Sequence, residues 1–205
     1  GGHRCRFAAL ADGSVVLAMG AWFQSLRGPL PKAKQFGQAF LWRSTDDGKT
    51  WQRSGSLGPH SCEADVLVLP SGRLLAAVRF QRKKLPSDSA ELAAPIWFDP
   101  DHVRDQCLEC QRFGALGVGG HSVFKQTALV ASDDGGRTWS APQLVTGWLQ
   151  QTGCLVRLSD GTLVLPFGHK TTVGGRGSAS GFWSATTREN PGAVPSLNCT
   201  TVAST

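Results

Sequence analysis

Two short segments of the chain share the pattern S-x-D-x-G-x-T-W, the first at residues 44–51 and the second at residues 132–139. Short apolar segments typical of β-strands flank both copies. Within the pattern, Ser and Asp oxygens can accept hydrogen bonds from nearby backbone amides, Gly can take a positive φ angle, and Trp can cover the turn. The pattern therefore predicts a structural turn between two strands in each copy. Its matching positions are Ser44, Asp46, Gly48, Trp51, Ser132, Asp134, Gly136 and Trp139.

Each copy of this pattern is called a box below. A second unit, strand–turn–strand, stands upstream of each box and occurs once more near the end of the chain. Its turns contain Asp12-Gly13, Ser71-Gly72 and Asp160-Gly161, which are strong hairpin signals between β-rich segments. Together the two units predict an all-β chain of four-stranded antiparallel blades, about three of them, as in a β-propeller. Because closed propellers use about four to eight blades, we expect either a longer propeller or partners that complete the ring, including self-association.

The expected blade boundaries follow from these repeats. Residues 3–58 form blade one, residues 60–147 form blade two, and residues 150–190 form blade three, whose third strand is 178–186. An insertion at 81–123 separates the second and third strands of blade two and is too long for an ordinary hairpin loop. The polar tail at 191–205 is expected to be poorly ordered or to lack its own blade.

The insertion contains residue types that can bind zinc, and the gap between its two cysteines suits a zinc knuckle. The spacing of the histidines matches no common finger, so no metal and no cofactor is predicted. The six cysteines of the chain also allow disulfides or separate thiols. The four weak metal candidates are His102, Cys107, Cys110 and His121.

Composition excludes several classes of protein. The chain is 40% hydrophobic and 18% charged, a balance typical of soluble globular proteins. The longest apolar segment, at 14–23, is about half as long as a membrane-spanning helix requires. The net charge is +6, but the basic residues are scattered, so no nucleic-acid partner is predicted. The start of the chain carries no signal from which a cellular location can be read.

The two boxes resemble the Asp boxes of the sialidase superfamily, and the hairpins at 62–79 and 158–169 are similar to those of sialidase-like bacterial proteins. The resemblance covers residues 3–190. It implies a six-bladed propeller that cleaves terminal sialic acid with retention, using a Tyr nucleophile helped by a Glu, an Asp acid/base and three arginines that hold the sugar carboxylate. This chain contains no Tyr, so it cannot by itself contain the family's full site.

Strand alternation places Glu63 and Asp65 on one side of the first strand of blade two, about 6 to 7 Å apart. Counting back from the turn at 71–72 places Glu63 opposite Arg79 or its neighbour. Glu63 and Asp65 are therefore the candidates for acid/base catalysis, and Arg79 for substrate binding. The Glu63–Arg79 pair can equally be a structural ion pair at the end of the blade.

The same count on the other blades adds two substrate-binding candidates. On blade three it places His169 opposite Thr152, and on blade one it places Arg4 and Arg6 at the corresponding edge. Arg4 is the better match to the arginine that the resemblance implies near the start of blade one. His169 can also be an ordinary surface or hydrogen-bonded histidine.

Three functions fit these observations. The first is a sialidase-like glycoside hydrolase that acts on terminal sialic acid or a related acidic sugar of glycoconjugates. The second is a non-catalytic Asp-box propeller that binds glycan or protein. The third is an Asp-box lyase or inverting hydrolase, which would use the candidate carboxylates, arginine and histidine without any Tyr.

Overall fold

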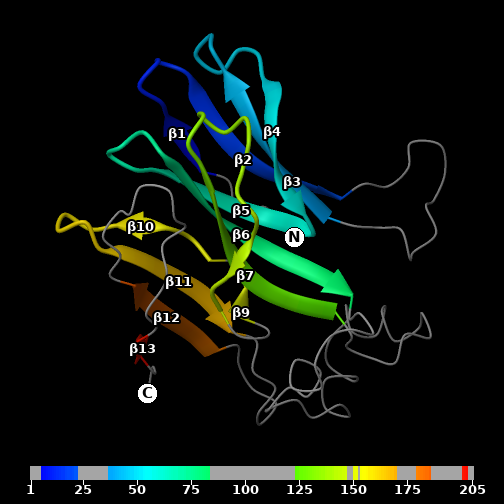
Figure 1. The fold of residues 1–205 in the computed structure, drawn as a ribbon, viewed down its shortest axis with the longest axis vertical. Coiled ribbons are helices and arrows are strands. Elements are labelled where there is room, and N and C mark those ends of the chain that lie inside the picture. Colours follow the sequence, from blue (N-terminus) through cyan, green and yellow to red (C-terminus); the bar gives the residue numbers. More distant parts are fainter. Residues whose placement is uncertain are drawn as a thin grey trace.

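The computed structural model describes residues 6–22, 37–83, 123–146, 150–151, 153–169, 179–185 and 200–202. These residues form three antiparallel sheets, here called sheets A, B and C, which follow one another along the chain (Figure 1). The described residues contain strands and no helix, and none of their segments is a helix that could cross a membrane. The all-β prediction is therefore confirmed for this part of the chain.

Sheet A has four strands in chain order: β1 (Phe7–Ala9), β2 (Val15–Trp22), β3 (Gly37–Ser44) and β4 (Gln52–Pro59). Sheet B repeats this order with β5 (Ser61–Val68), β6 (Leu74–Lys83), β7 (Val123–Ser132) and β8 (Gln143–Leu144). Both sheets place a strand–turn–strand unit before a box, because alternating apolar residues delimit the strands and turn residues separate them.

Sheet C has five strands. It follows the order β10 (Val156–Arg157), β11 (Leu163–His169), β12 (Ala179–Ala185) and β13 (Thr200–Val202), and β9 (Gln150–Gln151) also pairs with β11. The structure differs from the expectation for the tail, since Thr200–Val202 pairs with β12 as a fourth strand. Thr200–Val202 forms a strand because it hydrogen-bonds to the open edge of β12. The polar composition of the tail does not predict this pairing.

The three strand–turn–strand units close with the same turn. In each one, a leucine N–H donates to the carbonyl four residues later, at 2.8 Å: Leu10 to Ser14, Leu69 to Arg73, and Leu158 to Thr162. The glycines of the turns, Gly13, Gly72 and Gly161, have φ angles of 82°, 85° and 89°. A side chain would strain this left-handed conformation, which explains why each turn contains glycine.

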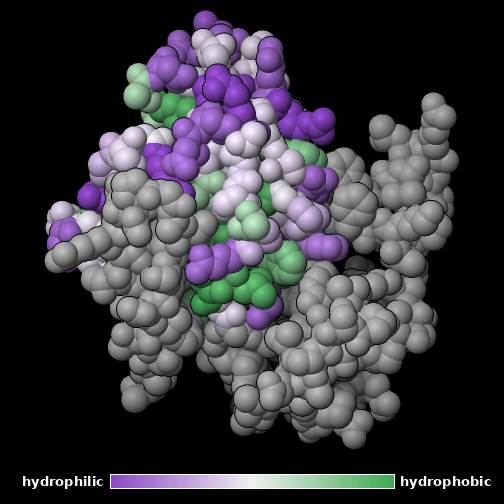
Figure 2. All heavy atoms as spheres, in the orientation of Figure 1, coloured by the Kyte–Doolittle hydropathy of each residue, from purple (hydrophilic) through white to green (hydrophobic). Residues whose placement is uncertain are grey.

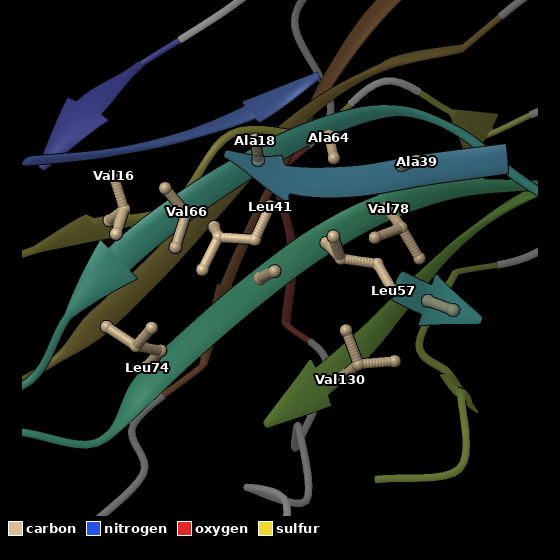
Figure 3. Close-up of a cluster of buried hydrophobic side chains, with 12 residues drawn as sticks. Val16, Ala18, Ala39, Leu41, Leu57, Ala64, Val66, Leu74, Val78 and Val130 are labelled. Atoms are coloured by element: carbon tan, nitrogen blue, oxygen red, sulfur yellow. The ribbon is translucent and has the colours of Figure 1, made fainter. Parts of the chain in front are cut away.

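Two apolar clusters join the sheets. The first lies between sheets A and B and includes Val16, Leu41, Val66, Leu74 and Val130, all fully buried (Figure 3). The second lies between sheets B and C and includes Leu75, Leu129, Leu155 and Leu165. Sheet B therefore packs one face on sheet A and the other on sheet C, since successive residues of a strand point to opposite faces.

Candidate functional site

Both boxes form the predicted turn with the same set of hydrogen bonds. In the first box, Ser44 Oγ donates to Asp46 Oδ1 at 2.7 Å, and Gly48 N donates to Ser44 Oγ at 2.9 Å. Thr50 Oγ1 donates to Asp46 Oδ2 at 2.6 Å, and Trp51 Nε1 donates to the Gly48 carbonyl at 2.9 Å. The box carboxylate therefore stabilises the turn by accepting hydrogen bonds within it.

The second box repeats these contacts. Ser132 Oγ donates to Asp134 Oδ1 at 2.8 Å, Thr138 Oγ1 donates to Asp134 Oδ2 at 2.6 Å, and Trp139 Nε1 donates to the Gly136 carbonyl at 3.1 Å. The hydroxyl and N–H of Thr138 and the hydroxyl of Ser132 hold the pKa of Asp134 well below its usual range. In the first box, the Thr50 hydroxyl, the Thr50 N–H and the Ser44 hydroxyl lower the pKa of Asp46 from 3.8 to about 2.

Glu63, Arg79 and His169 lie toward the ends of the strands opposite to the boxes, here called the site edge, whereas Asp65 lies further along β5. The site edge contains the end of β2, the start of β5 and the ends of β6 and β11. A Cβ added to Gly20 near the end of β2 would lie 2.0 Å from the carbonyl oxygen of Cys62 in β5. This close approach brings the edges of sheets A and B together, and only glycine leaves room for it.

Glu63 and Arg79 form an ion pair at the site edge. Arg79 Nη1 donates to both carboxylate oxygens of Glu63, at 2.8 Å each. The side chains are 10% exposed for Arg79 and 22% exposed for Glu63, so the pair is accessible to solvent on one side. The cross-strand count that placed these residues next to each other is confirmed.

A β-bulge positions this pair. Ser61 pairs with Phe80 and Ala64 pairs with Val78, so Cys62 and Glu63 together face Arg79 alone. Such a bulge bends its strand and redirects the side chain at that point. Strand alternation counts one residue per position and cannot reveal the extra residue.

Asp65 has a different environment from Glu63. It is 6% exposed and its Oδ2 accepts a hydrogen bond of 2.6 Å from Leu155 N, which belongs to the chain segment leading into sheet C. Its Oδ1 lies 3.2 Å from Arg6 Nε, and Arg6 Nη1 donates to the Leu155 carbonyl at 2.6 Å. Arg6, Asp65 and Leu155 thus link the start of sheet A, the middle of sheet B and the start of sheet C.

Arg6, which strand counting places at the same edge as the preferred candidate Arg4, contacts Asp65, and His60 was not among the predicted residues. His60 lies between β4 and β5 at the site edge, with an unusual φ of 64° and its ring edge-on to Phe80 at 5.7 Å. A non-glycine residue with positive φ is uncommon and often occurs near functional sites. No sequence signal marks this conformation.

The prediction for the partner of His169 is wrong. His169 pairs with Gln150, and Gly168 pairs with Gln151, so Thr152 does not face it. The register of Val156 with Val164 nearer the turn would by itself place His169 opposite Gln151, and one extra residue between the two pairings moves the partner to Gln150. His169 still ends β11 at the site edge.

Several sequence candidates lie outside the described residues. These are Arg4 and the four weak metal candidates His102, Cys107, Cys110 and His121. Within the described part of the chain, no three His, Cys, Asp or Glu residues gather as a metal site would require. Cys62 is buried, as expected of a small apolar residue, and Cys154 is a half-buried thiol.

Comparison with known proteins shows similarity only at the level of structure. No protein-family profile and no curated protein sequence matches the chain. A Dyadobacter fermentans protein of unknown function matches 88% of this chain and 36% of its own length, with a TM-score of 0.54 and 16% identity. A Hadza microbial sialidase matches 94% of this chain and 36% of its own length, with a TM-score of 0.53 and 18% identity.

A third similar structure is the Penicillium chrysogenum α-L-arabinanase, with a TM-score of 0.52 and 12% identity over 89% of this chain and 45% of the arabinanase. The chain therefore spans less than half the length of these three proteins. The structural neighbours include β-propeller glycosidases. At these identities the likeness shows a common fold, namely a succession of antiparallel sheets like those of propeller enzymes.

Proposed function

We propose that this chain belongs to a sialidase-like, carbohydrate-active β-propeller, a glycoside hydrolase acting on a terminal acidic sugar such as sialic acid. The structural neighbours support the carbohydrate-active fold, and the repeated boxes support the resemblance to Asp-box propellers. In this proposal the remaining blades come from further chain or from self-association. The substrate binds at the site edge.

The observation that carries the proposal is the ion pair between Arg79 and Glu63. A guanidinium binds carboxylates with well-defined geometry, so Arg79 is suited to the carboxylate of an acidic sugar. Such a sugar would compete with Glu63 for Arg79 Nη1, where both Glu63 oxygens now lie at 2.8 Å. Binding of the substrate would then release the Glu63 carboxylate beside the sugar.

The released Glu63 is our first candidate for acid/base chemistry. As an acid, the released carboxylate would first take up a proton from water and then donate it to the glycosidic oxygen while the bond from that oxygen to the anomeric carbon breaks. Arg4 and His169 are proposed as further substrate-binding residues, and His60 as an additional polar contact at the same edge. Asp65 is our second acid/base candidate, although its contacts with Leu155 N and Arg6 also suit a structural role.

The anomeric carbon also needs a nucleophile on the face opposite the acid. The chain contains no Tyr, so a retaining mechanism with a Tyr nucleophile would need that residue from another segment or chain. In an inverting mechanism, water would be the nucleophile and a second carboxylate would take its proton. Measuring the anomeric configuration of the first product distinguishes the two mechanisms.

A second candidate function is non-catalytic binding of acidic glycans. It is favoured by the engagement of both candidate carboxylates, Glu63 with Arg79 and Asp65 with Arg6 and Leu155 N. A site of this kind needs the guanidinium but no proton donor. An Asp-box lyase or inverting hydrolase remains a separate alternative, in which the bond is cleaved by elimination or by direct attack of water.

The test is binding and turnover of sialosides by wild type, Arg79→Lys and Glu63→Gln. Binding of N-acetylneuraminic acid and of a neutral pyranose would be compared by NMR titration, and hydrolysis would be followed with a fluorogenic sialoside. We expect binding of the acidic sugar only, with affinity reduced about tenfold or more in Arg79→Lys, because the planar guanidinium is lost. If Glu63 is the acid, Glu63→Gln retains binding and loses about two orders of magnitude in rate.

Arg73→Ala is a matched control. Arg73 directly precedes β6 and pairs with Asp133, its Nε lying 3.1 Å from Asp133 Oδ1, but at the end of the sheet opposite to the site edge. It should leave sugar binding unchanged. Equal affinity for acidic and neutral sugars would rule out the proposal. Binding without turnover by a protein in which the remaining blades are present would select the non-catalytic function.

A further inference from the structure

The three sheets use equivalent positions to pack on one another. By pairing register, Phe7, Leu17 and Met19 of sheet A correspond to Val66, Ala76 and Val78 of sheet B. Their counterparts in sheet C are Leu155, Leu165 and Phe167, by extension of the β10–β11 register. We call these positions the front face of each sheet. In sheet B this face packs on sheet A, and in sheet C it packs on sheet B.

The front face of sheet A has no such cover among the described residues. The front-face residues of sheets B and C are all at most 5% exposed, whereas Phe7 is 63% exposed and Met19 is 36% exposed. Phe7 and Met19 border a predominantly apolar hollow of about 730 Å³. Its lining residues are Phe7, Val15, Leu17, Met19, Trp42, Asp47, Gly48 and Trp51.

The two boxes also differ in whether a neighbouring sheet covers them. A Cβ added to Gly136 of the second box would lie 2.1 Å from Leu41 Cδ2 of sheet A, so this turn is docked on its neighbour. A Cβ added to Gly48, at the equivalent place in the first box, would meet only Trp51 Cζ2, at 3.7 Å. Trp42 Nε1, close to this box, is a buried donor with no hydrogen-bond partner among the described residues. The first box thus has the form of a docked turn without the sheet that would cover it.

Sheet C supplies the complementary surface, which we call its back face. The back-face positions of sheet A, Ala8, Val16 and Ala18, pack on sheet B, and their counterparts Leu67, Leu75 and Ala77 in sheet B pack on sheet C. The corresponding positions in sheet C are Val156, Val164 and Pro166 by register. Val156 is 39% exposed, and Val164 and Pro166 are half-buried.

We propose that the front face of sheet A in one copy of this chain receives the back face of sheet C in a second copy. The contact would repeat the packing of sheet B on sheet A and of sheet C on sheet B. Each copy carries both faces, so two copies can bury all four faces in a closed pair. The driving force is removal of the Phe7, Met19 and Val156 side chains from water, since large exposed apolar patches mark interaction sites.

The experiment measures the mass of the full chain in solution by light scattering, as a function of concentration. Wild type should associate, and Met19→Glu and Val156→Glu should each weaken the association at least tenfold. Both substituted side chains are already partly exposed, so folding of the single chain should survive, as checked by circular dichroism. Leu144→Glu is the matched control, because Leu144 is 46% exposed but lies on strand β8 of sheet B, away from both faces.

Mixing the two variants gives a second readout. A Met19→Glu copy keeps its back face and a Val156→Glu copy keeps its front face, so the mixture should form mixed pairs more readily than either variant alone. A wild-type chain that stays monomeric at high concentration would overturn the proposal. So would association that survives both substitutions, since it would use another surface.

Discussion

Arg43 of β3 donates a hydrogen bond from Nη2 to the carbonyl oxygen of Gly135, 2.5 Å away, across the boundary between sheets A and B. Its Nη1 donates to Asp12 Oδ2 at 3.0 Å and to Ser14 Oγ at 3.1 Å, within the first turn of sheet A. The arginine thus joins a hairpin turn of one sheet to the box of the next. Figure 2 shows that hydrophilic residues predominate in the upper part of this face of the molecule, with smaller apolar patches between them.

Replacing Arg43 with Met should destabilise the protein. The substitution keeps much of the aliphatic length but removes the hydrogen bond between sheets together with the exposed contacts to Asp12 and Ser14. We expect the free energy of unfolding to fall by about 1 kcal/mol. The measurement is urea unfolding followed by Trp fluorescence. Arg137→Met is the control, because the contact that Arg137 Nη1 makes among the described residues is with the Asp134 carbonyl within its own box, at 3.1 Å and in an exposed position. Equal losses in both variants would argue against a special role for the contact between sheets.

Gly136→Ala should be strongly destabilising, and Gly48→Ala much less so. Both glycines have positive φ angles, 89° for Gly136 and 83° for Gly48, so both substitutions introduce about 1 to 2 kcal/mol of backbone strain. Only at Gly136 does the new methyl collide with Leu41, which adds about 1 to 3 kcal/mol. The difference between the two unfolding free energies measures how tightly the second box docks. A difference near zero would show that the sheets can separate there without cost.

Asp65→Asn should lower stability whether or not the protein has catalytic activity. The neutral amide cannot both accept the hydrogen bond from Leu155 N and pair with the Arg6 guanidinium as the carboxylate does. We expect the free energy of unfolding to fall by about 1 to 3 kcal/mol. Thermal unfolding measures this loss, and Glu63→Gln is the comparison because Glu63 is more exposed. A fully stable Asp65→Asn variant that has lost activity would instead identify Asp65 as a catalytic acid or base.

Acid should weaken the boxes in a defined pH range. The Thr50 hydroxyl, the Thr50 N–H and the Ser44 hydroxyl stabilise the ionised form of Asp46, so its pKa falls from 3.8 to about 2 on folding. A lowered folded pKa contributes stability above about pH 4, and this contribution is lost as the pH falls from about 4 to about 2. Comparing urea midpoints of wild type and Asp46→Asn from pH 6 to pH 2 tests the assignment. The gap between them should narrow only below about pH 4, and a constant gap would contradict it.

The hydrogen-bonded turns could be predicted from the sequence because the residues that bond one another are close along the chain. The box contacts join residues at most four positions apart, and the hairpin turns close within the same distance, so residue types and spacing were sufficient. The pairing of Glu63 with Arg79 was also accessible, since a hairpin with a recognisable turn aligns its own strands.

The remaining contacts depended on how the sheets pack. Leu155 N bonds Asp65, which is 90 residues away in the sequence, and Arg6 bonds the Leu155 carbonyl, which is 149 residues away. Hydrophobic periodicity and turn motifs carry no information about pairs so far apart. The bulge at Cys62 and Glu63 and the register of His169 were likewise beyond strand counting, because one added residue shifts the pairing of those that follow. The sequence by itself determined the turns and the alternation of apolar residues, which are local properties of the backbone and side chains. Tertiary packing decided which carboxylate joins three sheets and which remains partly open at the site edge, because burial and long-range hydrogen bonds exist only once the sheets are stacked.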